Sequence, residues 1–174
     1  MSENVEFARK VEGFWHTLQQ DTASRAALKR CHDVTETQFV PAIYELARAI
    51  RTQREDYRNL ERIGAVAGLC AWVRDIDRSA AFGQQMSRTI AGDTRLVSEM
   101  RFRRLIQCQT VTELYVPLVR ILRLMKGQIN LADLAQSVLY WGDATRKNWA
   151  YQYYGATTVA DTSDIPDGDV LASA

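Results

Sequence analysis

Hydrophobic residues recur at intervals of three and four positions along most of the chain, which is the spacing of one face of an α-helix. Near the start, Val5, Ala8, Val11, Trp15 and Leu18 follow this rule, with polar residues between them. Comparable patterns predict further helices over residues 41–50, 60–73, 97–107, 110–125, 131–139 and 146–154, and a short basic turn or helix over residues 26–30. No stretch of strand length alternates apolar and polar residues in the way that marks a β-strand. The sequence therefore predicts an all-α fold of about eight helices.

Local signals refine two of these helices. Thr110 and Glu113 have the spacing of a capping box, in which each side chain bonds the backbone N–H of the other residue. Pro117 lies inside the helix that this box begins, so we expect a kink there or a later start. Gly64 and Gly68, four residues apart, lie on one face of their helix and predict that a neighbouring helix approaches closely.

Two segments interrupt the helical pattern. Residues 75–92 are polar and contain two glycines, and we expect them to form an irregular connection at the end of an N-terminal helical lobe, residues 1–92. A C-terminal helical lobe would then span residues 93–154. Residues 155–174 contain four aspartates, no lysine or arginine, and few large apolar residues, a composition typical of a disordered acidic tail. The expected architecture is a two-lobed helical bundle.

The net charge of +1 conceals an uneven distribution. Without the four acidic residues of the tail, 22 basic residues face 17 acidic ones, a net charge of +5. Arginine outnumbers lysine 18 to 4, and arginine is preferred where a planar donor must grip phosphate or stack on a ring. Residues 88–126 hold eight basic side chains and three acidic ones. This excess predicts a positive surface that attracts a polyanion such as nucleic acid.

Several classes of function lack support in the sequence. No apolar run is long enough for a membrane span, and the N-terminus lacks the apolar core of a secretory signal. Three widely spaced cysteines favour a reducing cytoplasm. Neither a metal-binding motif nor a glycine-rich phosphate loop is present, so we expect no metal and no cofactor. Asp75 and Asp77 lie beside Arg74 and Arg78, and Glu55 and Asp56 lie beside Arg54 and Arg58. These acidic and basic residues are expected to form solvated ion pairs and not to act as general acids or bases.

Two other interpretations remain open. Residues 131–139 and 146–154, separated by Gly142, could form a helix-turn-helix that reads a preferred DNA sequence. Alternatively, Cys31 and His32 could belong to the active site of an enzyme, although adjacent residues on a helix point in different directions. Trp141, Trp149 and Tyr153 have helical spacing, which favours a place in the core over a role in stacking on bases.

The order of several short motifs resembles one known family. They are Phe14-Trp15, the run from Leu28 to Cys31, the run from Arg101 to Ile106, the run from Leu118 to Arg123, the run from Tyr140 to Gly142, and Arg146-Lys147 with Trp149, Tyr153 and Tyr154. In this order and spacing they resemble the CasB family, the small subunit of the type I-E CRISPR surveillance complex Cascade. The resemblance covers residues 14–154 and leaves out the acidic tail.

The resemblance implies a non-enzymatic, all-α, two-lobed protein of the cytoplasm that acts in antiviral defence. In the complex it would lie beside a second copy of itself, stacked head to tail, and contact the backbone subunits and the large subunit. Its basic surface would hold the duplex of guide RNA and target DNA and the displaced DNA strand, which together form the R-loop. No membrane partner is implied.

The family's basic groups fall on particular residues of this sequence. Those that the resemblance implies are Lys29, Arg30, Arg58, Arg101, either Arg120 or Arg123, and Arg146; the arginine run and the last helix add Arg103, Arg104 and Lys147. Asp143 and Ala144 stand where some members are basic, so the positive charge near Gly142 is weaker here. We expect these ten residues to bind nucleic acid without reading its sequence.

Overall fold

Helices account for most of the chain in the computed structural model, which describes residues 2–50 and 57–155. They are α1 (Glu3–Gln20), α2 (Thr22–Arg30), α3 (Val34–Thr37), α4 (Ala42–Ile50), α5 (Tyr57–Cys70), α6 (Phe82–Ser87), α7 (Glu99–Ile106), α8 (Val111–Leu124), α9 (Leu131–Leu139) and α10 (Asp143–Gly155). The strands are short: β1 (Asp75–Ile76) pairs in parallel with β4 (Gln128–Ile129), and β2 (Thr89–Ala91) pairs with β3 (Thr94–Arg95) in an antiparallel hairpin. The predicted all-α fold is confirmed.

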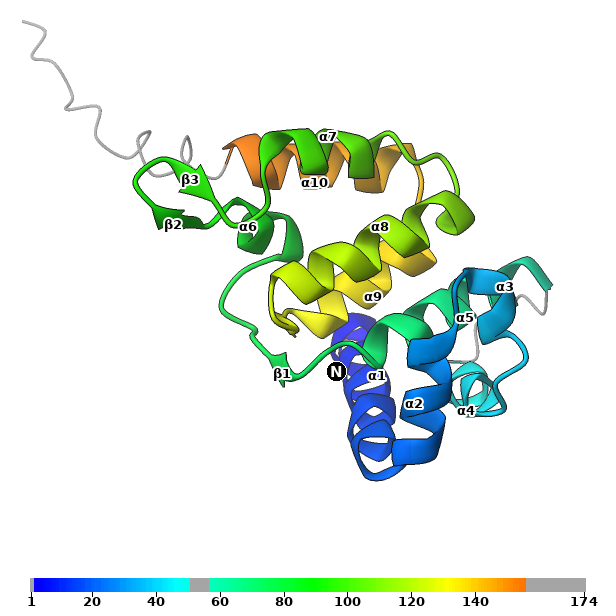
Figure 1. Ribbon diagram of the computed structural model, residues 1–174. Coiled ribbons are helices and arrows are strands. Elements are labelled where there is room, and N and C mark those ends of the chain that lie inside the picture. Colours follow the sequence, from blue (N-terminus) through cyan, green and yellow to red (C-terminus); the bar gives the residue numbers. More distant parts are fainter. Residues whose placement is uncertain (1, 51–56, 156–174) are drawn as a thin grey trace, which may run out of the picture.

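Helix α5 lies at the centre of the fold, where α3, α4, α8 and α9 pack around it (Figure 1). All residues of its second half, from Gly64 to Cys70, are buried. A side chain at Gly64 would collide with Thr37 of α3, and one at Gly68 would collide with the buried Tyr115 of α8. The close approach that the two glycines predict is therefore present, and it involves two different neighbours.

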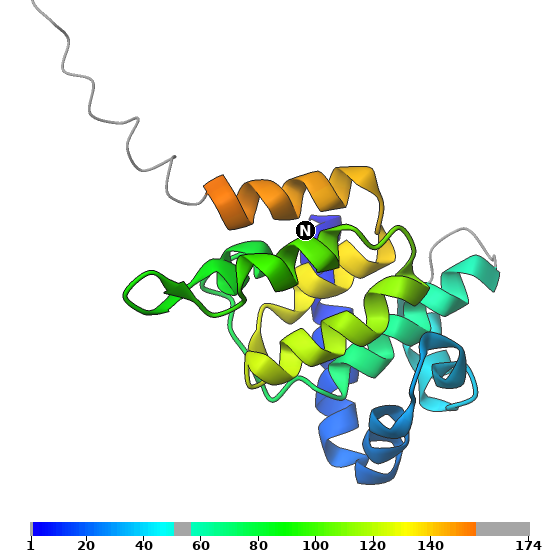
Figure 2. The same cartoon turned by 45° about the horizontal axis from the view of Figure 1, so that its top comes forward.

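The last helix, α10, packs mainly on α6 and also contacts α7, which lies alongside it (Figures 1 and 2). The contact is aromatic: the rings of Phe102 and Tyr153 stack with their centroids 3.9 Å apart, and Trp149 packs against Phe82 and Trp141. Trp149 and Tyr153 are 0% and 1% exposed. Trp141 is buried as well, so the prediction that these aromatic residues belong to the core is confirmed.

Helix α8 begins at Val111 and continues through Pro117, so the later start considered from the sequence is wrong. The Thr110 side chain accepts a hydrogen bond from the N–H of Glu113, as expected of a helix cap. Proline has no N–H to donate to the carbonyl four residues earlier, which belongs to Glu113. The Sγ of Cys108 lies 3.6 Å from this carbonyl oxygen and 3.5 Å from that of Arg104, so its single proton is shared between two possible acceptors.

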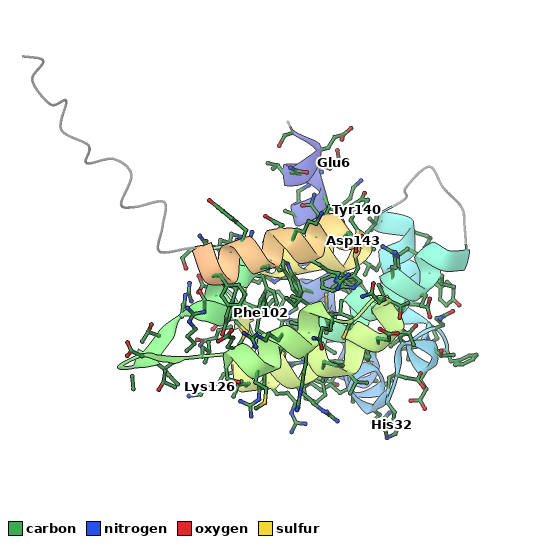
Figure 3. The ribbon with its side chains drawn as sticks, turned by 90° about the horizontal axis from the view of Figure 1, so that it is seen from above. Glu6, His32, Phe102, Lys126, Tyr140 and Asp143 are labelled. Carbon is green, nitrogen blue, oxygen red and sulfur yellow. The ribbon has the colours of Figure 1, made fainter. Side chains whose placement is uncertain are left out.

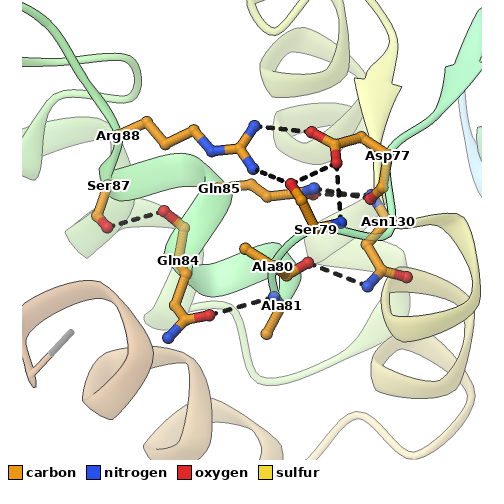
Figure 4. Close-up of polar contacts among 9 residues, drawn as sticks. All are labelled: Asp77, Ser79, Ala80, Ala81, Gln84, Gln85, Ser87, Arg88 and Asn130. Atoms are coloured by element: carbon orange, nitrogen blue, oxygen red, sulfur yellow. Dashed lines mark hydrogen bonds and ion pairs between the residues drawn. The ribbon is translucent and has the colours of Figure 1, made fainter. Parts of the chain in front are cut away.

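Residues 75–92 were expected to be irregular, but they contain β1, α6 and β2 and are held by a polar network (Figure 4). The buried Gln85 side chain donates to the carbonyl of Asp77 at 2.9 Å and accepts from the N–H of Asn130 at 2.7 Å. The Asp77 carboxylate accepts from Ser79 and is paired with Arg88 at 2.8 Å. Ser79 and Arg88 lower the pKa of Asp77 well below its usual range. Polar side chains thus organise a segment that has no apolar periodicity.

The structure differs from the sequence expectations mainly at element boundaries. Helices α3 and α6 were not expected, because four and six residues are too few to show a helical period. Helix α2 begins at Thr22, four residues earlier than expected, because Asp21 caps it by accepting from the N–H of Ser24. The division into lobes at residue 92 stays a prediction. The expected tail comprised residues 155–174; Gly155 is the last residue of α10, and residues 156–174 lie outside the described residues.

Replacing Gln85 by leucine should lower the free energy of unfolding by about 2–4 kcal/mol, because the carbonyl of Asp77 and the N–H of Asn130 would lose their buried partner. Urea denaturation followed by circular dichroism would measure the change. The matched control is Gln20→Leu, at an exposed position whose side chain makes no hydrogen bond within residues 2–50 and 57–155. Equal stability of the two variants would show that the network contributes nothing.

Candidate nucleic-acid interface

Helix α7 presents the arginine run to solvent because its other side is anchored in the core. Ser98 caps the helix, and Phe102 and Leu105 are fully buried. Arg101, Arg103 and Arg104 are consequently exposed. Only Arg103 has a carboxylate partner among the described residues, with its guanidinium 2.7 Å from Glu99. This pair neutralises one of the three charges and leaves Arg101 and Arg104 available to an external anion.

Helices α2 and α8 carry the next predicted residues, Lys29, Arg30, Arg120 and Arg123, which are all exposed. Residues from the two helices meet at Trp72, just beyond the end of α5. The Nζ of Lys29 lies 4.9 Å from the centroid of the Trp72 ring, and the Cζ of Arg123 lies 5.3 Å from it. The fold therefore brings together two predicted residues that are far apart in the sequence.

Three further residues belong to this region and were missed from the sequence. Trp72 supports the two cations, and Arg25 and Arg74 lie close enough to lower the pKa of Lys29. Arg25 escaped attention because α2 was expected to begin after it. Arg74 was assigned to solvated ion pairs. Only the tertiary structure shows that these residues, which lie in separate parts of the sequence, share one surface.

The two basic residues of α10 behave differently. The guanidinium of Arg146 donates to the carbonyl of Ile106 at 2.5 Å and to the amide oxygen of Gln109 at 3.2 Å, and it is paired with Asp143 at 3.0 Å. Its side chain is 24% exposed. Lys147 is exposed and has no carboxylate partner within the described part of the chain. Arg146 therefore holds α10 against the end of α7, whereas Lys147 is free to contact a ligand.

The remaining sequence assignments are only partly covered by the structure. The side chain of Arg58 lies outside the described residues, as do Glu55 and Asp56. Asp77 pairs with Arg88 within its own segment. Arg78 instead reaches Glu12 of α1. Asp77 thus forms a partly exposed ion pair, as expected, but its partner and that of Arg78 come from other parts of the chain than the neighbouring residues.

The geometry of Cys31 and His32 does not support a nucleophile. The Cys31 thiol donates to the carbonyl of Ala27 at 3.4 Å, and burial, with Glu36 and Asp33 nearby, raises its pKa. A raised pKa disfavours the reactive thiolate. The exposed His32 ring lies against Glu36, with its Nδ1 3.2 Å from a carboxylate oxygen. Neither residue activates the other.

A helix-turn-helix is also poorly supported by the structure. The first residues of a recognition helix contact base edges. In α10 these positions are occupied by Asp143 and Ala144, and the donors of Arg146 are engaged within the protein. Figure 3 shows Asp143 near Tyr140, and Asp143 is exposed, so the N-terminus of α10 presents a carboxylate paired with Arg146 where a recognition helix would contact bases.

Two other searches gave negative results for the residues that the structure describes. Within them, no helix is both long enough and apolar enough to cross a membrane. The described residues also contain no group of three or more His, Cys, Asp or Glu side chains placed to hold a metal ion.

The fold and the surface together define a small helical protein whose exposed cations outnumber the carboxylates available to pair with them. The sequence profile of the family described as CRISPR-associated protein Cse2 matches residues 24–154. The chain belongs to this family, which confirms the resemblance to CasB stated from the sequence. No curated protein sequence matches the chain.

Two solved structures share the fold. One is a chain of E. coli Cascade bound to a PAM-containing double-stranded DNA target; the TM-score is 0.65 at 20% identity, over 84% of this chain and 97% of that chain. The other is CasB from Thermus thermophilus, with a TM-score of 0.64 at 22% identity, over 89% of this chain and 99% of that chain. At these identities the likeness concerns the fold alone.

Arg146 and Lys147 are adjacent in the sequence but lie in different environments, so replacing each of them tests its role. Arg146→Ala should lower the free energy of unfolding by about 1–3 kcal/mol, because the carbonyl of Ile106 loses its donor and α10 loses a link to α7. Lys147→Ala should change it by no more than about 0.5 kcal/mol, as is usual for an exposed side chain. Thermal and urea unfolding of both variants would show the difference. Equal effects would contradict the structural role of Arg146.

Proposed function

We propose that this chain is the non-enzymatic small subunit of a type I-E Cascade complex, in which it holds nucleic acid through contacts to backbone phosphates. The observation that carries this proposal is a set of exposed cations that have no carboxylate partner within the described part of the chain. The members of this set that were predicted from the sequence lie on four helices: Lys29, Arg30, Arg101, Arg104, Arg120, Arg123 and Lys147.

Unpaired cations on a rigid helical surface favour binding to a polyanion. Each lysine or arginine that neutralises a phosphate releases condensed counterions, and this term is independent of base sequence. In guide-directed complexes, base pairing supplies the sequence specificity, and the protein reads only charge and shape. A surface of this kind is therefore suited to hold the guide RNA–target DNA duplex and the displaced strand.

A few phosphate contacts are enough to shift the equilibrium of R-loop formation. Formation of an R-loop exchanges one duplex for another of similar stability, so small contributions from protein contacts shift the balance. Belonging to the Cse2 family supports placing this chain in such a complex, and the fold matches a chain of E. coli Cascade bound to its DNA target. The backbone subunits, the large subunit and a second copy of this chain are the expected protein partners.

The arginines of α7 provide a test with a control inside the same helix. Arg101→Ala and Arg104→Ala should each make the dependence of log K on log salt shallower by about 0.7 for single-stranded DNA. Arg103→Ala should have a smaller effect, because Glu99 already neutralises its charge. Fluorescence anisotropy at several salt concentrations, with single strands, duplexes and RNA of scrambled sequence, would give these slopes.

The same titrations separate the proposal from its alternatives. Binding that is equally tight for all sequences supports phosphate recognition. A preference for one duplex sequence would favour a helix-turn-helix regulator instead. If Arg101→Ala and Arg104→Ala leave both the affinity and the salt dependence unchanged, α7 is not part of the nucleic-acid interface.

A further inference from the structure

Trp72 lies where three helices meet, and four cations surround it. Lys29 of α2 and Arg123 of α8 lie over its ring. The distance to the ring centroid is 4.9 Å from the Nζ of Lys29 and 5.3 Å from the Cζ of Arg123. Arg25 donates from its Nε to the carbonyl of Ala71, the residue before Trp72, at 3.2 Å. Arg74 follows two residues later and is exposed. We refer to these five residues as the Trp72 cluster.

The backbone fixes this arrangement. Gly127, at the end of α8, has φ = +68°, and a Cβ there would lie 2.5 Å from the carbonyl oxygen of Trp72. Its carbonyl accepts from the N–H of Arg74 at 2.9 Å, and its own N–H donates to Leu122 of α8 at 2.9 Å. The parallel pairing of β1 with β4 extends this contact between the segment that follows α5 and the segment that follows α8. The C-terminal end of α8 is therefore tied to the segment that carries Trp72. Figure 3 shows Lys126, the residue before Gly127.

The cluster concentrates positive charge without compensating it. No carboxylate of residues 2–50 or 57–155 is ion-paired with Arg25, Lys29, Arg74 or Arg123. Burial, together with the charges of Arg25 and Arg74, lowers the pKa of Lys29. The indole ring attracts the two cations above it, but the four cations also repel one another. An anion bound among them would relieve this repulsion.

We propose that the Trp72 cluster is a binding site for backbone phosphates of a nucleic-acid strand, in which Trp72 positions Lys29 and Arg123 and does not stack on a base. This inference rests on the proposed function and extends it to a defined site. A base that stacked on Trp72 would have to displace a cation from the ring. Several cations in one place match a strand better than a single carboxylate, because each strand of a duplex carries one charge per about 3.4 Å along the axis.

The fluorescence of Trp72 gives a local readout. The other three tryptophans, Trp15, Trp141 and Trp149, are buried, whereas Trp72 is partly exposed. The difference between the full-length protein and its Trp72→Phe variant isolates the signal of Trp72. We expect iodide to quench this signal more strongly than neutral acrylamide does, because the cations attract iodide. An added oligothymidylate should reduce the iodide quenching by about half or more, since it competes for the same cations.

Charge variants test the site through binding. Lys29→Glu and Arg74→Glu should each weaken binding of oligothymidylate and make its salt slope shallower by about 0.7 or more. Arg48→Glu is the matched control, because Arg48 is an exposed residue of α4 outside the cluster. Trp72→Phe should retain binding, since phenylalanine also attracts cations, whereas Trp72→Leu should lose as much as a cation variant. Circular dichroism would confirm that each variant is folded.

Three outcomes would overturn the inference. The first is oligothymidylate binding that leaves the iodide quenching of Trp72 unchanged while Arg101→Ala and Arg104→Ala still weaken binding; the proposed function would then stand without this site. The second is equal protection of Trp72 by polyglutamate, which would assign the cluster to acidic protein surfaces. The third is that Lys29→Glu and Arg48→Glu weaken oligothymidylate binding equally. The cluster would then contribute only through the net charge of the protein.

Discussion

The complete burial of the second half of α5 is the constraint on which the rest of the structure depends. A helix that is apolar on all sides has to be covered on all sides, and here α3, α4, α8 and α9 provide the cover. Gly64 and Gly68 let α3 and α8 come close enough to do so. Because α5 is enclosed, the position at which the chain leaves it is also fixed. Trp72 therefore lies at a set distance from α2 and from the end of α8.

Hydrogen bonds and ion pairs of polar side chains stabilise the segment between α5 and α7. This segment buries Phe82 and Met86 in the core, and hydrogen bonds of the Gln85 side chain to Asp77 and Asn130 hold it in place. The carboxylates near this segment are largely used within the protein, Asp77 by Arg88 and Glu12 by Arg78. They are thereby unavailable to the cations of α2, α7 and α8. Each of these pairs joins one acid to one arginine, so the positive charge available to a ligand comes from the basic residues that have no such partner.

This division of charges gives the proposed function its physical basis. A basic residue that is tied to a carbonyl or a carboxylate, as Arg146 is, contributes to the fold and little to binding. A basic residue such as Arg104 or Lys147 retains its charge for an external partner. The interface that we propose therefore depends on which basic residues lack a partner within the protein. It depends only weakly on the total number of basic residues. Proteins that hold nucleic acid without reading its sequence need no more than such a surface.

The sequence by itself determined the all-α fold, most of the longer helices and the aromatic core of α10, because these depend on local periodicity and on the burial of apolar side chains. It also indicated the arginine run of α7 and the family. Only the tertiary structure decided that α3 and α6 form, that Asp77 pairs with Arg88, and that Lys29 and Arg123 meet at Trp72. Short helices, ion pairs and ring contacts of this kind depend on which distant segments the core brings together. A local pattern of residues does not show which distant segments will meet. The helical period, in contrast, is repeated at every turn and can be recognised in the sequence.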